Sequence, residues 1–199
     1  MLRRRDLFER RAPHGLELLT PDATAELVAR VRERGFFVER EHAERDPELK
    51  QIIPYCVLRR GGDVFLMRRL AAGGDARLHG KRSIGVGGHV EPPDRAAGGG
   101  DVVVAALRRE LSEELTLAAP CDVRAVGVLN DDSTEVGAVH AGLVFVGRTA
   151  GAVSVRETAV LEGEFVPATA VERLAHEERS TFETWSALLI DRLVDLRGD

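Results

Sequence analysis

Three glutamates near the middle of the chain have the spacing of a metal-binding helix face. Glu110, Glu113 and Glu114 stand at positions i, i+3 and i+4, and a helix that turns about 100° per residue places them on one face. Arg109, four residues before Glu113, can pair with it and orient the group. Like charges this close repel unless a cation lies among them, and carboxylate oxygens are preferred ligands of Mg²⁺ and Mn²⁺. The pattern therefore indicates a divalent-metal site or a solvated acidic face.

A glycine-rich segment precedes these acids in the chain. Residues 83–90 contain Gly85, Gly87 and Gly88, and backbone without side chains can approach a ligand or metal closely. His89 follows directly, and it is either a phosphate contact or a hydrogen-bonded structural histidine. The loop favours the metal-site interpretation of the acids.

Loop and helix together resemble the Nudix box, which is written G-x5-E-x7-R-E-U-x-E-E-x-G-U with U an aliphatic residue. Gly88 takes the place of the first glycine and Asp94 that of the first acid. The helical core of the motif is matched by Arg109, Glu110, Leu111, Glu113 and Glu114. On these residues the chain resembles the Nudix hydrolase family.

The chain departs from this motif in three ways. The step from Asp94 to Arg109 spans 15 positions where the family pattern has 8, so seven residues are extra. Loop entropy grows slowly with length, so the loop and helix can keep their relative places. An aspartate, Asp94, replaces the usual glutamate, and Thr116 stands where the family ends its helix with glycine. We expect the extra segment, residues 95–101, to close over or beside the substrate.

The resemblance implies an α/β fold, a Nudix-type α/β/α sandwich with a mixed β-sheet. It also implies hydrolysis of a phosphoanhydride in a nucleoside diphosphate linked to another group X, which is a nucleotide, a nucleotide sugar or a dinucleotide. Mg²⁺ (or Mn²⁺) would be held by Glu110, Glu113, Glu114 and the Gly88 carbonyl. The ion would neutralise the diphosphate and activate water.

Further charged residues are candidates for the same reaction. In many family members a glutamate of the box or of a later loop deprotonates the attacking water, and the loop candidates here are Glu135, Glu162 and Glu164. Arginines can grip phosphate oxygens bidentately, and those flanking the expected strand ends are Arg68, Arg69 and Arg82. For each of these residues a solvated surface charge is the alternative interpretation.

The elements that position these residues can be predicted from hydrophobic periodicity. Apolar residues at helical spacing predict a helix over 22–34, within an N-terminal extension of helix plus charged connector over residues 1–50. The Nudix hydrolase domain is expected over 51–199. It would begin with a β-hairpin, because the apolar runs 52–58 and 64–67 flank a Gly-Gly-Asp turn. A helix over 102–115, β-strands at 123–129, 139–146 and 152–155, and a final helix over 182–196 complete the prediction.

Composition excludes several classes of protein. The chain has 199 residues and a net charge of -5, which argues against broad binding to nucleic acid or to an anionic membrane. Its two cysteines, Cys56 and Cys121, are too few for a disulfide scaffold. No apolar window approaches the roughly 18 residues of a membrane helix. We therefore expect a cytoplasmic protein that binds neither nucleic acid nor a membrane. The family resemblance implies a small-molecule nucleotide substrate, and the sequence leaves homodimer formation open.

Two other functions compete with hydrolysis. Some Nudix-like domains bind a nucleotide as sensors without turning it over, but such domains usually lose glutamates of the box, and all three are present here. Isopentenyl diphosphate isomerases share the fold and a Gly-His pair like Gly88-His89. They place a catalytic cysteine just before that pair, where this chain has Gly87.

Overall fold

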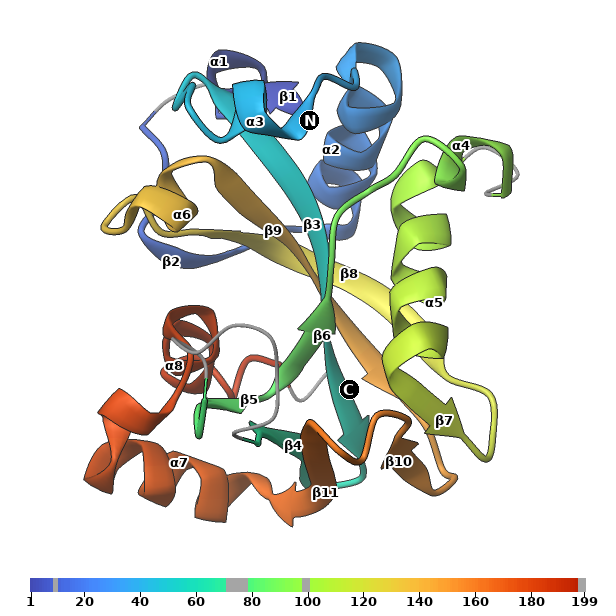
Figure 1. Cartoon of the computed structure of the whole chain (residues 1–199), viewed down its shortest axis with the longest axis vertical. Coiled ribbons are helices and arrows are strands. Elements are labelled where there is room, and N and C mark those ends of the chain that lie inside the picture. Colours follow the sequence, from blue (N-terminus) through green and yellow to red (C-terminus); the bar gives the residue numbers. More distant parts are fainter. Residues whose placement is uncertain (9–10, 71–78, 98–100, 197–199) are drawn as a thin grey trace. The chain divides into compact units, whose positions relative to one another are not determined.

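The computed structural model describes residues 1–8, 11–70, 79–97 and 101–196 (Figure 1). The strands are β1 (Leu2–Arg3), β2 (Gly15–Leu18), β3 (Leu49–Arg60), β4 (Asp63–Arg69), β5 (Arg82–Ser83), β6 (Gly85–Gly87), β7 (Leu115–Leu117), β8 (Asp122–Asn130), β9 (His140–Arg148), β10 (Val153–Val155) and β11 (Leu161–Pro167). The helices are α1 (Arg4–Leu7), α2 (Pro21–Arg34), α3 (Arg40–Ala43), α4 (Asp94–Ala97), α5 (Val102–Glu114), α6 (Glu135–Ala138), α7 (Ala168–Glu177) and α8 (Thr184–Ile190), with a 3-10 turn at Arg179–Thr181.

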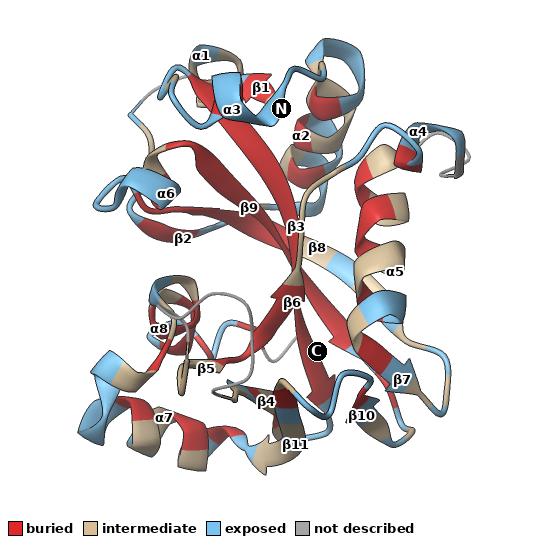
Figure 2. Cartoon of the chain, in the orientation of Figure 1, coloured by how far each residue is buried: buried red, intermediate tan, exposed pale blue. Residues whose placement is uncertain are grey.

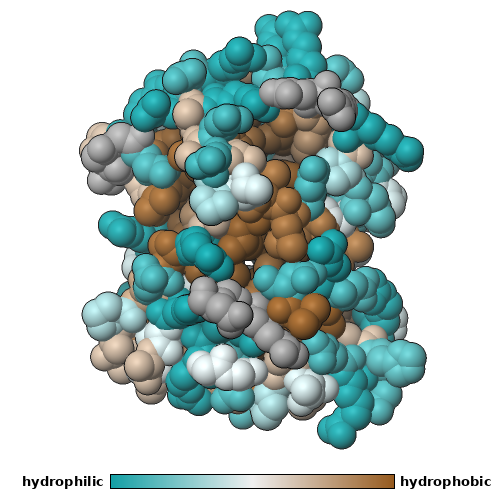
Figure 3. Space-filling view, turned by 180° about the vertical axis from the view of Figure 1, so that it is seen from behind, coloured by the Kyte–Doolittle hydropathy of each residue, from teal (hydrophilic) through white to brown (hydrophobic). Residues whose placement is uncertain are grey.

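One large sheet contains most of these strands. Its order is β11-β4-β3-β9-β8-β2, with β1 and β6 also paired to β3 and β5 to β4, while β7 and β10 form a second, small sheet. Nearly every residue of β3 and β9 is buried (Figure 2). Both hydrophilic and apolar side chains reach the surface seen from behind (Figure 3). The predicted α/β class with a large mixed sheet is confirmed.

The chain divides into two compact units, which are described separately. Unit 1 comprises Met1–Tyr55, Gly87–Arg109 and Ala125–Phe145, and unit 2 comprises Cys56–Val86, Glu110–Arg124 and Val146–Asp199. The strands β3, β6, β8 and β9 and the helix α5 contribute residues to both.

In unit 1 the first fifty residues supply the helices α1, α2 and α3, the strands β1 and β2, and the start of β3. The predicted helix is present as α2, where the Thr20 hydroxyl accepts a hydrogen bond from the Ala23 N–H (3.2 Å) and Pro21 occupies the first turn, the expected start signals. The strand β1 pairs with β3, with Leu2 opposite Lys50. The strand β2 pairs with β8. The division of the chain at residue 50 stays a prediction.

In unit 2 the predicted hairpin is present as β3 and β4. Its turn contains Gly61, whose φ of +58° favours glycine,. The strand β4 also pairs antiparallel with β11 from Asp63 to Arg69, and the rings of Phe65 and Phe165 meet edge-on with centroids 5.2 Å apart. The strand β11 and the helix α7 were not predicted from the sequence. The last helix is shorter than predicted, because α8 ends at Ile190 and turns follow.

The helix α5 carries the motif glutamates and has the predicted bounds within one residue. Asp101 starts it, since its carboxylate accepts hydrogen bonds from the N–H groups of Val103 and Val104, both at 3.0 Å. Leu107 and Leu111 are buried. At its end the chain enters β7 directly, where Thr116 pairs with Ser154. The helix therefore ends without the left-handed glycine that the family motif has there.

Helices of the described residues are too short or too polar to cross a membrane.

Candidate active site

Several charged side chains of unit 2 influence Glu114, the last residue of α5. Burial raises the pKa of Glu114 to about 7; Arg69 acts in the opposite direction, and the carboxylates of Glu110, Glu183 and Glu157 raise the pKa further. Arg69 itself donates a hydrogen bond from Nε to Glu183 Oε1 (2.9 Å). Glu114, a half-buried carboxylate, is therefore influenced by the charges of three other carboxylates, with one arginine acting against them, and such an electrostatic environment favours binding of a cation.

The chemistry of these donors fits a divalent cation. Glu110 is half-buried and Glu113 is exposed, and oxygen ligands of this kind suit Mg²⁺ and Mn²⁺. In the part of the chain that the structure describes, no three metal-ligating side chains are already gathered at coordinating distance.

The backbone of Glu114 is fixed by a neighbouring loop. The carbonyl of Glu114 accepts a hydrogen bond from the Arg156 N–H (2.8 Å), and the Arg156 guanidinium donates to the carbonyl of Ser112 (2.6 Å). These bonds use carbonyls at the end of α5 that have no partner within the helix. They hold the turn that carries Glu113 and Glu114.

In unit 1, Arg109 connects the glycine-rich loop to α5. Its guanidinium donates to both carboxylate oxygens of Asp94 (3.0 and 3.1 Å) and to the carbonyl of His89 (2.7 Å). Asp94 also accepts a hydrogen bond from the Glu91 N–H (2.8 Å). Burial acts to raise the pKa of Asp94, but the hydrogen bond from Arg109 and the one from Glu91 outweigh it, so this pKa is lowered. The carboxylate of Asp94 is therefore engaged in holding the loop.

His89 contacts a second histidine. The Nε2 atoms of His89 and His140 are 3.0 Å apart, and Nδ1 of His140 lies 2.6 Å from the carbonyl oxygen of Val136. Burial lowers the pKa of His89 to about 4, with the charges of His140 and Arg40 adding to the effect, and burial also lowers that of His140. These lowered pKa values favour the neutral form of both rings near pH 7. A neutral His89 would offer a phosphate no positive charge, and its contact with phosphate stays a prediction.

The three predicted phosphate-binding arginines, all in unit 2, have different surroundings. The positive charge of Arg69 lowers the pKa of Glu114, against the effect of burial. Arg68 is exposed opposite Glu162, with 3.6 Å between Nη1 and Oε1. Arg82 donates to Glu178 (3.0 Å) and Thr181. Arg69 is therefore the best supported of the three.

The predicted loop acids occupy exposed positions. Glu162 and Glu164 lie on β11, and Glu135 lies in the first turn of α6 in unit 1. Sequence reasoning missed Glu157 and Glu183, which act on Glu114.

The extra segment of the motif is described only in part. Residues 95–97 belong to α4, and residues 98–100 lie outside the described residues. The guanidinium of Arg95 lies 5.9 Å from the centre of the Phe37 ring, a cation–π distance. Closure of the segment over the substrate stays a prediction.

Comparison with known proteins identifies the family. The NUDIX domain model matches residues 50–185, so the chain belongs to this family, and it is a Nudix hydrolase.

Particular relatives and solved structures are similar to this chain. Protein YmaB of Bacillus subtilis (strain 168) is 36% identical over 174 residues, which cover 85% of this chain and 83% of YmaB. Tm1382, a protein assigned to the Nudix hydrolases, is 29% identical in sequence to this chain, and its crystal structure matches with a TM-score of 0.79. The match covers 98% of this chain and 97% of the Tm1382 chain. The NUDIX domain of Shewanella oneidensis NrtR, solved with ADP ribose, has the same fold at 14% sequence identity and a TM-score of 0.54. The match covers 80% of this chain and 98% of the NrtR chain.

Proposed function

We propose that this Nudix hydrolase is a divalent-metal-dependent pyrophosphohydrolase that cleaves a phosphoanhydride of a nucleoside diphosphate linked to a group X. The observation that carries the proposal is Glu114, a half-buried carboxylate on the motif helix, whose pKa is raised to about 7 by burial and by the charges of three other carboxylates. Such a group binds either a proton or a cation near neutral pH.

The proposed ligands of the ion, Mg²⁺ or Mn²⁺, are Glu110, Glu113 and Glu114, and the family resemblance adds the Gly88 carbonyl. When bound, the ion neutralises phosphate charge and makes water a better nucleophile. Arg69 supplies a positive charge for a phosphate oxygen and limits the repulsion among the acids. Water adds to one phosphorus as the bridging P–O bond breaks, so each product leaves with its own phosphate.

Two acids are proposed as alternatives for the general base. The charges of Glu183 and Glu157 both raise the pKa of Glu114, one of the proposed ligands. Glu183 is also bound by Arg69, which favours its ionised form. Glu183 is therefore the first candidate to test.

Turnover of a substrate panel tests the proposal. The panel contains nucleoside di- and triphosphates, nucleotide sugars, ADP-ribose, dinucleoside polyphosphates and coenzyme A, each with and without Mg²⁺ or Mn²⁺, with products identified by mass. Glu114→Gln removes one charge at the site, and Glu177→Gln makes the same change at an exposed position of α7. We expect cleavage at a phosphoanhydride that needs the metal, is lost in Glu114→Gln and persists in Glu177→Gln. Saturable binding of one compound without turnover would instead support a sensor.

A further inference from the structure

His140 stands at the start of β9 in unit 1 and is tied to the glycine-rich loop by one side-chain hydrogen bond. Its Nδ1 lies 2.6 Å from the carbonyl oxygen of Val136, and a carbonyl oxygen only accepts, so Nδ1 carries the proton. In a neutral ring Nε2 is then an acceptor. The nitrogen that faces it at 3.0 Å, His89 Nε2, must be the donor. The pair therefore has one consistent tautomeric arrangement, with His89 donating to His140.

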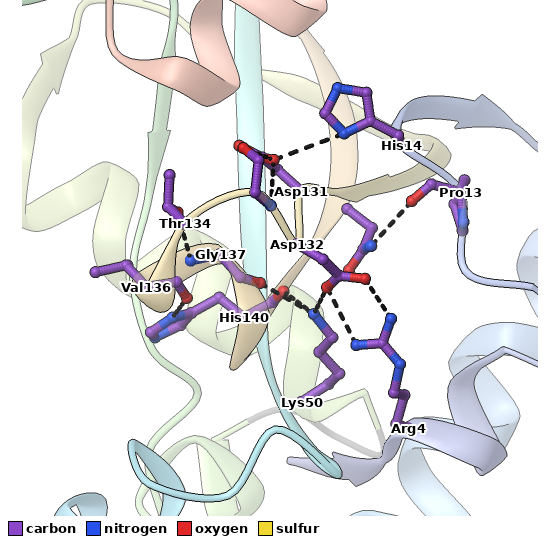
Figure 4. A network of polar contacts seen from close by, with 12 residues as sticks. Arg4, Pro13, His14, Lys50, Asp131, Asp132, Thr134, Val136, Gly137 and His140 are labelled. Carbon is purple, nitrogen blue, oxygen red and sulfur yellow. Dashed lines mark hydrogen bonds and ion pairs between the residues drawn. The ribbon is translucent and has the colours of Figure 1, made fainter.

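The backbone of His140 is held by a buried lysine. Lys50 is fully buried, and its ammonium group donates to Asp132 Oδ1 (2.7 Å), to the Gly137 carbonyl (3.0 Å) and to the His140 carbonyl (3.2 Å) (Figure 4). All three protons of the ammonium group thus have acceptors.

The N-terminal helix and β3 contribute to the same arrangement. Asp132 also accepts hydrogen bonds from Arg4 of α1 (Figure 4). The Val139 carbonyl accepts a hydrogen bond from the Gln51 N–H (2.8 Å). The position of the His140 ring is consequently fixed by contacts from the N-terminal segment, from β3 and from the α6 turn.

On the other side of the contact, His89 belongs to the loop that the function needs. It directly follows Gly88, and its own carbonyl accepts the hydrogen bond from Arg109 (2.7 Å). A side chain at Gly87 is excluded, because its Cβ would come within 2.1 Å of the Pro54 carbonyl oxygen. The loop backbone therefore lies close against β3 at Gly87, is held by Arg109 at the His89 carbonyl and is held by His140 at the His89 ring.

We propose that His140 is a positioning residue of the hydrolase, which sets the orientation of the Gly88–His89 backbone by accepting the hydrogen bond of the His89 ring. The residue itself touches neither substrate nor metal and acts through His89. The kinetic part of this inference rests on the proposed function, because it takes the Gly88 carbonyl as a metal ligand. Mutation of a residue that orients a metal ligand without touching the metal typically lowers metal affinity or activity by about 10- to 100-fold.

Three variants separate positioning from packing. His140→Phe keeps a ring but removes the acceptor, and His140→Gln retains an acceptor oxygen near the position of Nε2. Thr134→Ala is the control, because Thr134 caps α6 through the Gly137 N–H (2.9 Å) and its loss perturbs the same turn without touching His89. In full-length protein we expect His140→Phe to raise the Mg²⁺ concentration for half-maximal activity by about 10-fold or more. His140→Gln should lie within about threefold of wild type, and Thr134→Ala within about twofold.

Two measurements on the metal-free protein do not depend on activity. Long-range ¹H–¹⁵N spectra of ¹⁵N-histidine-labelled protein should show His140 protonated on Nδ1 and His89 on Nε2. Hydrogen exchange should show amides 85–91 losing protection in His140→Phe and keeping it in Thr134→Ala. If His140→Phe does not fold, His89→Phe removes the same hydrogen bond from the loop side and should give the same results.

The opposite tautomers, or unchanged exchange and metal dependence in His140→Phe, would overturn the proposal. Equal damage in His140→Gln and His140→Phe would also overturn it, because the acceptor would then be irrelevant. If wild type turned over no compound of the panel while the spectra and exchange behaved as expected, the proposed function would fail and the positioning role of His140 would stand.

Discussion

Asp94→Asn should destabilise the protein by about 2–3 kcal/mol. The wild-type carboxylate accepts two hydrogen bonds from Arg109 at 3.0 and 3.1 Å and one from the Glu91 N–H at 2.8 Å. Removing one partner of a buried pair costs about 3–5 kcal/mol. The side chain of Arg109 is 23% exposed, so water screens part of that cost, and the expectation lies below this range.

The assay is urea unfolding of wild type and variant between pH 3 and pH 8. Because the fold lowers the pKa of Asp94 from its ordinary value of 3.8, its contribution is present above that value and is lost as the pH falls through the folded pKa. The stability difference should therefore be constant near neutral pH and shrink on acidification. Asp101→Asn is the matched control, since asparagine also caps helices and the cost should stay below about 0.5 kcal/mol. Equal effects of the two substitutions at pH 7 would refute the assignment of Asp94 as the acid that binds Arg109.

Three further outcomes are expected. Lys50→Met should lower stability by about 2–3 kcal/mol in urea unfolding, because the buried Gly137 and His140 carbonyls lose a charged donor; a loss below about 0.5 kcal/mol would show that these contacts contribute little. The metal-free protein should lose stability as the pH rises from about 4.5 through about 7, since Glu114 has a raised pKa in the fold,, and Glu114→Gln should flatten this dependence in thermal unfolding at several pH values. Glu183→Gln should weaken Mn²⁺ binding measured by calorimetry. It should also shift the acidic limb of the pH–rate profile to lower pH, because one carboxylate that raises the Glu114 pKa is removed. Unchanged binding and an unchanged profile would exclude Glu183 from the site.

Sequence signals within short segments predicted the helices and hairpins that neighbouring residues form. The cap at Thr20 and the periodic Leu27 and Val31 sufficed for α2, and the glycine turn between two apolar runs sufficed for the β3–β4 hairpin. The strand β11 was missed because alternating glutamates and Gly163 weaken its apolar pattern. Its identity as a strand comes from pairing with β4, far away in the sequence.

The candidate site shows the same division. Glu110, Glu113 and Glu114 could be proposed because their spacing on one helix is visible in the sequence. Asp94 was proposed as the first acid of the family motif, and that role stays a prediction, although its carboxylate binds Arg109. Glu183 acts on Glu114 across a long sequence separation, so spacing carries no sign of it. The role of Arg69 likewise depends on tertiary contacts, and the sequence could rank it only with Arg68 and Arg82.

The most direct test of the proposed function is a single-turnover reaction in H₂¹⁸O with the best substrate of the panel. The account predicts that one ¹⁸O atom appears in a phosphate of one product, only when Mg²⁺ or Mn²⁺ is present, in wild type and Glu177→Gln but not in Glu114→Gln. Cleavage that persists in EDTA, or equal ¹⁸O incorporation by Glu114→Gln, would contradict a metal-dependent phosphoanhydride hydrolysis that relies on Glu114.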